Sequence, residues 1–428
     1  MAAAARAAPA PVERTAMPAK RRRLLYIDMA YTMEIVRQKR HFQFFEMRHS
    51  GNYFDRVWGV HPLADAAGKR SRAIEILPFS ERQTIVEGVS QTLPLPKFLL
   101  PINFLISQWK LLRLLRGLVR DQDISMIIAT DAHYAGLVGL ILKRTTKRPL
   151  AVGVFANQDD LYAATGALAM PRLLPFRFLE RWVARLVLSR ADLVFAGNRD
   201  NLAFAVANGA HGDTAIIPVA KNVEAVHLTG PAEREPPQRL LADLGVPAEA
   251  PLMLFVGRLL PLKHPDEAVR AMARVIERRP DAVGLVAGSG PMQAELETLV
   301  EQAGMSGKIH FIGHVDQIEL SRIVPHAITL SPLTGMALIE CGLGASPLVV
   351  FDRDWQAEFV EDGVNGFVVP FLDHEAMAER TLRLIDDPQL RARMAGAARE
   401  RALAFADRER IHALEHAVYD RLLERWDR

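Results

Sequence analysis

Two cationic side chains, Arg258 and Lys263, stand five residues apart, directly after a short apolar stretch, Leu252–Val256, and a glycine, Gly257. An apolar stretch that stops at glycine predicts a buried strand followed by a loop. An arginine and a lysine on such a loop could hold a diphosphate and neutralise the negative charge that grows on it when a bond to it breaks. Cations that only face solvent would give the same pattern, so this segment alone leaves both interpretations open.

A second loop contains two glycines, Gly288 and Gly290, in the sequence Ala287-Gly288-Ser289-Gly290-Pro291. It leads from another apolar stretch into a predicted helix. Backbone N–H groups at a helix start, together with the helix dipole, suit an anion. Glycines at a strand-to-helix turn also occur for steric reasons alone, and that alternative stays open.

A third segment, Ser331–Glu340, opens a further helix after an apolar stretch. Thr334 and Gly335 fit a helix start that exposes backbone amides, and Glu340 falls about one and a half turns into the helix. A carboxylate in that place is suited to two vicinal hydroxyls of a ribose. The alternative is a carboxylate that only interacts with the helix dipole, which is common.

Short apolar stretches alternate with amphipathic ones through most of the chain. The apolar stretches are rich in branched residues and show no alternation, which is typical of strands covered on both faces. Helical patterns such as Asp266–Arg278 and Pro291–Ala303 separate most of them, and strand–helix repetition predicts parallel sheets with right-handed crossovers. The predicted strands are Leu24–Ile27, Met126–Ala129, Leu150–Phe155, Leu193–Ala196, Ala215–Ile217, Leu252–Val256, Val283–Ala287, Ile309–Ile312, Ala327–Leu330 and Leu348–Phe351.

A proline-rich break near residues 230–250 divides this pattern into two halves. We therefore predict an α/β protein with two Rossmann-like, doubly wound domains that face each other across a cleft, where ligands of such sheets bind. The expected parts are a disordered basic tail (1–23), an N-terminal Rossmann-like domain (24–228), a linker (229–250), a C-terminal Rossmann-like domain (251–405) and a helix that packs back on the first domain (406–428).

The composition excludes several classes of protein. A chain of 428 residues with 50% apolar and 24% charged residues is neither collagenous, disordered nor disulfide-stapled. The single cysteine, Cys341, excludes an intramolecular disulfide and fits a reducing compartment. No apolar stretch approaches the ~18 residues of a spanning helix. The cations Lys20–Arg23 before an apolar stretch imitate a secretory signal, but Asp28 interrupts that stretch, so we expect a cytoplasmic location.

Charge is distributed unevenly along the chain. Residues 24–225 carry 25 basic and 18 acidic side chains, whereas residues 226–428 carry 22 and 31. The two halves should therefore face different partners. Zinc-finger spacing and a basic–aromatic RNA signature are both missing from the sequence, so an anionic membrane is favoured over nucleic acid as the partner of the basic half.

Two basic amphipathic stretches belong to that half. Lys97–Arg120 contains five basic residues and no acidic one, with Lys110, Arg113, Arg116 and Arg120 at helical spacing. We interpret this stretch as a surface for the inner face of a cell membrane. A similar stripe, Arg172, Arg177, Arg181 and Arg185, fits a helix packed on the sheet with solvated arginines slightly better.

Taken in order, the three loops and the later segments Pro347–Val350 and Glu358–Gly366 resemble the retaining glycosyltransferases of family 4, the group-1 nucleotide-sugar enzymes of GT-B fold. The resemblance is specific over about 250–405 and only topological over 24–225. It implies a nucleotide-diphosphate-sugar as donor, a glycan or lipid-linked acceptor, and no bound cofactor.

The resemblance also implies roles for single residues. Arg258 and Lys263 match the cations that hold the donor's diphosphate and assist its departure. Glu340 matches the second glutamate of a paired motif, which binds the nucleotide ribose. The remaining donor-binding candidates are the loop residues Gly257, Gly288, Gly290, Thr334, Gly335, Met336, Ala337 and Leu338.

Some positions depart from the family pattern. The first glutamate of the paired motif is Pro332 here, so Thr334 or a backbone amide would have to contact the donor sugar. Asp28–Thr32 stands where a glycine-rich loop is usual, and Asn157 lies in the segment where a histidine often follows the strand. His133, near Asp131, resembles a histidine close to the cleft.

The sequence Asp352-Arg353-Asp354 has the form of a metal-binding pair in another class of sugar transferase. Enzymes of GT-B fold use side-chain cations in place of a metal, so we assign no metal to these aspartates and expect none to be required.

The predicted function is sugar transfer with retention at the anomeric carbon, the acceptor being a lipid-linked or nascent surface polysaccharide. Two alternatives stay open: a non-catalytic glycosyltransferase-like partner subunit, which Pro332 would suit, and a GT-B nucleotide-sugar epimerase.

Overall fold

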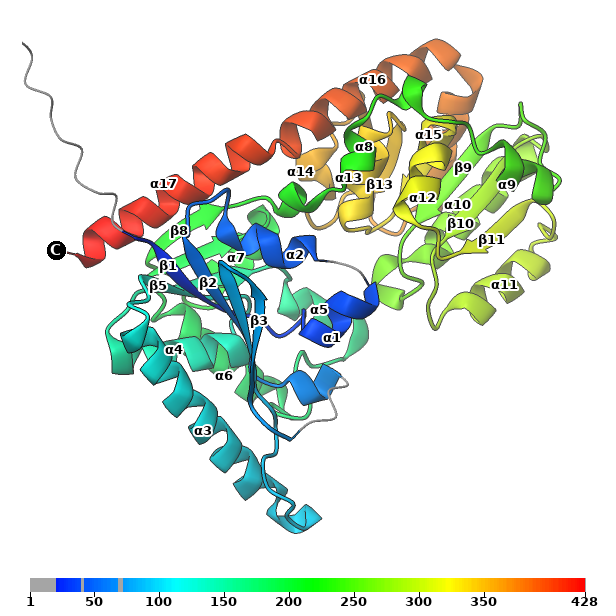
Figure 1. Ribbon diagram of the computed structural model, residues 1–428. Coiled ribbons are helices and arrows are strands. Elements are labelled where there is room, and N and C mark those ends of the chain that lie inside the picture. Colours follow the sequence, from blue (N-terminus) through cyan, green and yellow to red (C-terminus); the bar gives the residue numbers. More distant parts are fainter. Residues whose placement is uncertain (1–20, 40–41, 68–71, 428) are drawn as a thin grey trace, which may run out of the picture.

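The computed structural model describes residues 21–39, 42–67 and 72–427, which form two α/β domains (Figure 1). Of the tail expected at 1–23, residues 1–20 lie outside the described residues. In the first domain the strands are β1 (Arg23–Ile27), β2 (Arg56–His61), β3 (Glu75–Ser80), β4 (Gln83–Glu87), β5 (Met126–Ala129), β6 (Leu150–Val154), β7 (Leu193–Ala196) and β8 (Asp213–Ile216). Its helices are α1 (Met33–Lys39), α2 (Gln43–Glu46), α3 (Leu100–Asp121), α4 (Tyr134–Thr146), α5 (Gln158–Thr165), α6 (Arg177–Leu188) and α7 (Arg199–Ala207).

The connecting segment carries α8 (Ala225–Leu228) and α9 (Gln238–Asp243). In the second domain the strands are β9 (Leu252–Val256), β10 (Val283–Ala287), β11 (Ile309–Gly313), β12 (Ala327–Ser331), β13 (Leu348–Phe351) and β14 (Gly366–Val369). The helices after β9 are α10 (Pro265–Arg278), α11 (Gln293–Gln302), α12 (Gln317–Ile323), α13 (Met336–Leu343), α14 (Gln356–Phe359), α15 (His374–Asp386), α16 (Pro388–Phe405) and α17 (Arg408–Trp426).

Strand order confirms the predicted fold class. The second sheet runs β11-β10-β9-β12-β13-β14 with parallel neighbours, the doubly wound order of a Rossmann fold. The first sheet runs β3-β4-β2-β1-β5-β6-β7-β8, and β3 pairs antiparallel with β4 at its edge. In each sheet the direction of strand succession reverses beside the strand that comes first in sequence, β1 in the first sheet and β9 in the second. The crevice at such a point, beyond the carboxyl ends of the strands, is where ligands bind.

The predicted strands all lie within one or two residues of observed ones, because buried parallel strands must be apolar along their whole length. Sequence patterns missed β2, β3, β4 and β14. β3 alternates between half-buried and exposed positions at a sheet edge, and β14 is four residues long and begins at a glycine.

Helices α3, α4 and α6 cover one face of the first sheet. Leu111 and Leu115 of α3 and Val187 of α6 are fully buried and share one apolar core with Ile127 of β5 and Val152 of β6. Among the described residues, no helix has both the length and the apolarity to cross a bilayer.

The turn after β1 is stabilised by a buried ion pair where the family pattern has a glycine-rich loop. Asp28 accepts a hydrogen bond from the backbone N–H of Ala30 at 2.8 Å, and its other oxygen pairs with the Arg48 guanidinium at 2.8 Å. Both side chains are at most 6% exposed. The buried pair therefore fixes this turn without the conformational freedom of glycine.

The last helix, α17, lies along the first domain, so the chain crosses between the domains twice (Figure 1). Asp420 accepts a hydrogen bond from the Tyr53 hydroxyl at 2.8 Å, and Arg408 donates to the Val223 carbonyl at 2.7 Å. Tyr419 packs beside Phe54, with ring centres 5.7 Å apart. These contacts tie the end of the chain to the first domain.

Candidate active site in the cleft between the domains

A cavity of about 580 Å³ lies between the two domains. Loops at the carboxyl ends of strands from both sheets form it, as the fold requires. The first domain contributes Phe155, Ala156, Asn157, Asp160, Leu161, Ala163, Gly197, Asn198, Asp200, Asn201 and Val219. The second domain contributes Leu262, Lys263, His264, Leu333, Gly335, Met336, Ile339, Arg353, Asp354, Trp355, Phe371, Leu372 and Phe405.

Two of the predicted loops meet because their strands are neighbours. β9 pairs with β12, with Leu252 opposite Ala327. The loops that follow these strands therefore leave the sheet side by side. A Cβ atom on Gly257 would stand 3.6 Å from the methyl group of Thr334. The cationic loop and the start of α13 thus belong to one site.

The two predicted catalytic cations lie near each other at this site. Lys263 lines the cavity, and burial lowers the pKa of its ammonium group, while the nearby charge of Asp354 raises that pKa and the charge of Arg258 lowers it further. Arg258 is exposed and is not among the lining residues. Both cations can therefore act on one anion at the edge of the cavity.

Gly288 and Gly290 serve the packing of the loops. Gly288 has φ +144°, and a Cβ there would stand 1.8 Å from the Gly257 carbonyl oxygen. A Cβ on Gly290 would stand 2.3 Å from the Leu259 carbonyl oxygen, and Leu259 N–H donates to the Ser289 carbonyl at 3.1 Å. Neither glycine lines the cavity. They let the loop after β10 press against the cationic loop and hold it in place.

At the start of α13 the structure separates the candidate residues. Gly335 and Met336 line the cavity. Thr334 is 3% exposed, and its hydroxyl is hydrogen-bonded to Ser331, while its carbonyl accepts from the Gln356 amide at 3.1 Å. Leu338 is fully buried in the core, and Ala337 is half-buried. Of this loop, the backbone at Gly335 faces the cavity, whereas the Thr334 hydroxyl does not.

Glu340 lies one turn beyond the lining residue Met336 and is not itself among the lining residues. It is 9% exposed. Burial raises the pKa of its carboxyl to about 7, and the neighbouring carboxylate of Glu224 adds to the rise. Near neutral pH a ligand bound beside Glu340 can therefore change the protonation state of its carboxyl.

Of the three first-domain candidates, only Asn157 lines the cavity, and its amide donates to the Asp200 carboxylate at 3.1 Å. Asp131 and His133 follow β5 and are not among the lining residues. His133 is 3% exposed, and burial lowers the pKa of its imidazole. Burial raises the pKa of Asp131 to about 6, and its carboxylate accepts a hydrogen bond from the backbone N–H of His133 at 2.7 Å.

Four charged residues of the cavity were not predicted. Asp160 and Asp200 come from α5 and α7, and Arg353 and Asp354 follow β13. Arg353 pairs with Asp160 at 3.3 Å across the cleft. Burial raises the pKa of Asp354, as do the charges of Asp200 and Asp160, while the Lys263 charge lowers it. A signal was available, because the sequence Asp352-Arg353-Asp354 directly follows a predicted strand at the ligand-binding edge of the sheet.

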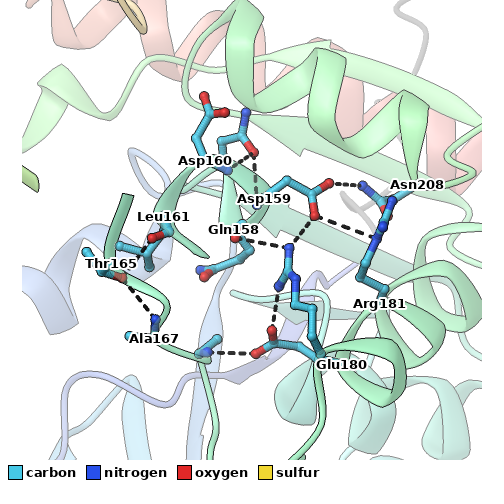
Figure 2. Close-up of polar contacts among 12 residues, drawn as sticks. Gln158, Asp159, Asp160, Leu161, Thr165, Ala167, Glu180, Arg181 and Asn208 are labelled. Carbon is cyan, nitrogen blue, oxygen red and sulfur yellow. Dashed lines mark hydrogen bonds and ion pairs between the residues drawn. The ribbon is translucent and has the colours of Figure 1, made fainter. Parts of the chain in front are cut away.

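A polar network holds α5, which carries Asp160, against α6 (Figure 2). Arg177 donates to the Gln158 carbonyl at 3.1 Å and pairs with Asp159 and Glu180. Glu180 is fully buried and also accepts the Ala169 N–H at 2.6 Å. This network fixes the first-domain wall of the cavity from behind.

Among residues 21–39, 42–67 and 72–427, no group of three or more His, Cys, Asp or Glu side chains is placed to hold a metal ion. The cationic side chains in or beside the cavity are those of Lys263, Arg353 and Arg258.

Two family models match separate parts of the chain. The model described as glycosyl transferases group 1 matches residues 238–401, and the glycosyl transferase 4-like domain matches residues 78–220. The two regions correspond to the two sides of the cleft.

Curated relatives match over part of their length. Alpha-D-kanosaminyltransferase of Streptomyces kanamyceticus is 31% identical over 156 residues, 34% of this chain and 39% of that protein. D-inositol 3-phosphate glycosyltransferase of Streptomyces griseus is 34% identical over 178 residues, 38% of each chain. The matches thus span about two fifths of the length of these relatives.

Solved structures match almost the whole chain. Sucrose-phosphate synthase from Thermosynechococcus elongatus has a TM-score of 0.69 at 18% identity and covers 94% of this chain and 100% of that one. Anabaena HepE in complex with UDP and glucose has a TM-score of 0.67 at 18% identity, covering 92% and 97%. At this identity the likeness shows a shared fold. With the family models, it confirms the predicted resemblance: the chain belongs to the glycosyl transferases group 1 family and has the GT-B fold.

Proposed function

We propose that the protein is a retaining glycosyltransferase that moves a sugar from a nucleotide-diphosphate-sugar to a glycan or lipid-linked acceptor. One observation carries the proposal. The Lys263 ammonium, with Arg258 beside it, faces a cavity whose opposite wall, on the other domain, presents the carboxylates of Asp160 and Asp200. Cations on one wall suit a diphosphate, and carboxylates on the other suit the hydroxyl groups of a sugar.

The donor would lie with its diphosphate at Arg258 and Lys263 and at the backbone N–H groups that begin α13 near Gly335. These donors stabilise the charge that develops on the departing diphosphate. The ribose would contact Glu340. HepE, which shares the fold, has been solved with UDP and with UDP-glucose, and this supports a uridine or related nucleotide here.

The sugar would extend toward the first domain. Pro332, which replaces the family's first glutamate, is buried and offers no side-chain hydrogen bond. Arg353 and Asp354 reach the same cavity from the next strand, β13. We infer that these two side chains, together with Asn157, take over contacts to the sugar hydroxyls. The reaction needs no metal in this scheme because Lys263 and Arg258 carry the compensating charge.

The acceptor would approach from the basic first domain, and acceptors linked to membrane lipid would suit its charge. The buried, reduced Cys341 fits a cytoplasmic location.

A thermal-shift screen over UDP, GDP and ADP and their sugars tests the proposal first. A nucleotide present at a hundredfold excess over its Kd should stabilise the protein by about 2.7 kcal/mol. The variant Lys263→Ala should lose most of this shift, whereas Arg270→Ala, which changes an exposed cation on α10, should keep it. If none of these compounds shifts the midpoint, the donor site is wrong.

Product analysis separates the remaining alternatives. A transferase releases nucleotide diphosphate when an acceptor is supplied, an epimerase converts the sugar without any acceptor, and a non-catalytic partner subunit does neither. Retention is read from the anomeric configuration of the product by NMR.

A further inference from the structure

The first half of α3 is built with its apolar side outward. Phe98, in the turn before the helix, is 78% exposed, and Ile102, Leu105 and Trp109 are 52%, 67% and 56% exposed. Their spacing of four, three and four residues puts them on one face. An ordinary surface helix turns such a face to the core.

The inward side of the same half is polar. Asn103 is fully buried, accepts hydrogen bonds from the backbone N–H groups of Thr92 and Leu93 at 3.1 Å and donates to the Leu93 carbonyl at 2.7 Å. Gln108 and the buried Ser107 donate to the Val89 carbonyl at 2.9 Å and 2.5 Å. These bonds fix the rotation of the helix, so the outward apolar side is held in place by the fold.

A second exposed apolar group lies at the start of α6. Phe176, Phe178 and Trp182 are 59%, 72% and 58% exposed. The rings of Phe176 and Phe178 stack with centres 5.6 Å apart. Helix α4 packs against both α3 and α6, and all three cover the same face of the first sheet (Figure 1).

A groove of about 840 Å³ lies between the start of α3 and the segment that precedes α6, and Leu105 of the first group is among its lining residues. On one side it is lined by Leu100, Pro101, Phe104 and Leu105 of α3, and on the other by the segment 170–173 that precedes α6. Met29, two residues after β1, also lines the groove. Most of the lining is apolar.

Cations surround these apolar groups. On α3 they are Lys110, Arg113 and Arg120, all exposed, and Arg113 lies over the Trp109 ring at 5.6 Å. On the other side of the groove and on α6 the exposed cations are Arg172, Arg181 and Arg185. From Lys97 to Arg120 the sequence has no acidic residue.

We propose that this surface, the α3–α6 face, binds an anionic lipid bilayer and that the groove takes a hydrocarbon chain of a lipid from that bilayer. Aromatic and aliphatic side chains flanked by cations match the boundary between headgroups and acyl chains. A second copy of the chain fits poorly, because a symmetric contact would bring the same cations together.

The groove and the cavity lie at the same end of the first sheet, beyond the carboxyl ends of its parallel strands. The groove residue Met29 follows β1, and the cavity residues Phe155 and Asn157 follow β6. Only β5 stands between these strands in the sheet, so their ends are roughly 10 Å apart. If the proposed transferase function holds, the chain in the groove belongs to the acceptor, and its headgroup reaches the donor cavity. Bilayer binding itself does not depend on that function.

Vesicle flotation tests the bilayer contact. The full chain should float with vesicles of phosphatidylglycerol and phosphatidylcholine, should be released by high salt, and should bind vesicles of phosphatidylcholine alone at least about tenfold more weakly. The double variants Trp109→Ser/Phe178→Ser and Lys110→Gln/Arg113→Gln should each lower partitioning by about tenfold. Arg393→Gln, at an exposed cation on α16, is the matched control and should bind as the parent does.

Tryptophan quenching locates the contact. In variants that keep a single exposed tryptophan, lipids brominated in the acyl chain should quench Trp109 or Trp182. They should leave Trp426 unquenched, because it lies on α17 beside the far end of α4. Phe104→Trp in the same background reports on the groove and should be quenched most by lipids brominated deep in the chain.

Several results would overturn the inference. In the flotation assay these are a complete lack of flotation, or equal binding to neutral and anionic vesicles. In the quenching assay it is quenching of Trp426 as strong as that of Trp109. A dimer that forms without lipid and that Trp109→Ser dissociates would also contradict it. A Phe104→Trp signal that lipid leaves unchanged would exclude the groove. Thermal shift with nucleotides on the same variants keeps the two proposals apart, since loss of bilayer binding should leave nucleotide binding intact.

Discussion

The guanidinium of Arg353, from the loop after β13, lies 3.3 Å from the carboxylate of Asp160, at the start of α5 in the other domain. Both side chains line the cavity, and Arg353 also covers the Phe371 ring at 5.3 Å. A second cross-domain contact lies close by, where Glu358 accepts the backbone N–H of Arg199 at 2.9 Å. The two domains therefore meet through polar contacts at the site itself, which suits a cleft that opens and closes around a ligand.

Breaking the Arg353–Asp160 pair should cost little stability. The two side chains are 46% and 42% exposed, and pairs of that kind contribute about 0.2–1 kcal/mol. A double-mutant cycle with Arg353→Ala and Asp160→Ala, measured by urea unfolding, should give a coupling energy in that range that shrinks in high salt. A coupling well above it would mean that the pair is a structural clamp.

Removing either cation of the loop after β9 should damage turnover. Arg258→Ala and Lys263→Ala are each expected to lower kcat by about 100- to 1000-fold, the cost of one lost donor to a developing anion. Steady-state kinetics with the donor identified by thermal shift provides the measurement, and Arg270→Ala is the matched control. Near-normal kcat in Arg258→Ala would contradict the assigned role.

Glu340 should make stability depend on pH. The pKa of its carboxyl is raised from about 4.5 in the unfolded chain to about 7 in the folded protein. The protonated carboxyl therefore contributes its full share to the free energy of unfolding below pH 4.5, and this share is lost as the pH rises through 7. Relative to Glu340→Gln, the parent protein should lose up to about 3 kcal/mol between pH 5 and pH 8. Urea unfolding at several pH values measures this difference, and parallel curves for the two proteins would show that the carboxyl is not buried as described.

The same group should affect donor binding. If Glu340 accepts hydrogen bonds from the ribose, its ionised form binds more strongly. UDP-glucose affinity should then rise with pH through about 7 in the parent and not in Glu340→Gln, as calorimetry would show. A pH-independent affinity in both proteins would remove Glu340 from the ribose site.

Gly288 should not tolerate a side chain. A Cβ there would meet the Gly257 carbonyl oxygen at 1.8 Å, and φ +144° is unfavourable for any other residue. Gly288→Ala should destabilise the protein by more than about 2 kcal/mol and weaken donor binding by displacing the cationic loop. Gly396→Ala, in α16 with open space around it, should instead stabilise by about 0.5–1 kcal/mol. Similar midpoints for both variants would mean that the loop adapts.

The buried pair Asp28–Arg48 should matter far more than an exposed one. Asp28→Asn leaves the Arg48 charge buried without its partner and should cost about 3–5 kcal/mol. Asp123→Asn breaks the pair with Arg148, in which Asp123 is 77% exposed, and should cost less than about 1 kcal/mol. Chemical unfolding of both variants decides the point, and equal losses would contradict the account of the turn after β1.

Sequence patterns determined the parts of the structure in which neighbouring residues share one environment. β5, β7, β9, β10 and β13 were predicted with their observed bounds, because a strand covered on both faces is apolar at every position. The same logic placed Gly257 at the end of a strand, and Gly335 was predicted at a helix start, where the structure has it. It failed for β3, whose alternating burial comes from its place at a sheet edge, and for β2, which begins with arginine and ends with histidine.

What only the tertiary structure decided is which side chains meet. Asp160 and Arg353 are nearly two hundred residues apart, and neither segment indicates the other as its partner. They meet because two sheets place the ends of β6 and β13 on opposite walls of one cavity. Thr334 and Gly335 are adjacent in sequence, yet the Thr334 hydroxyl turns inward to Ser331 while Gly335 faces the cavity. Local sequence specifies the helix start, but orientation toward a ligand depends on packing from the rest of the domain.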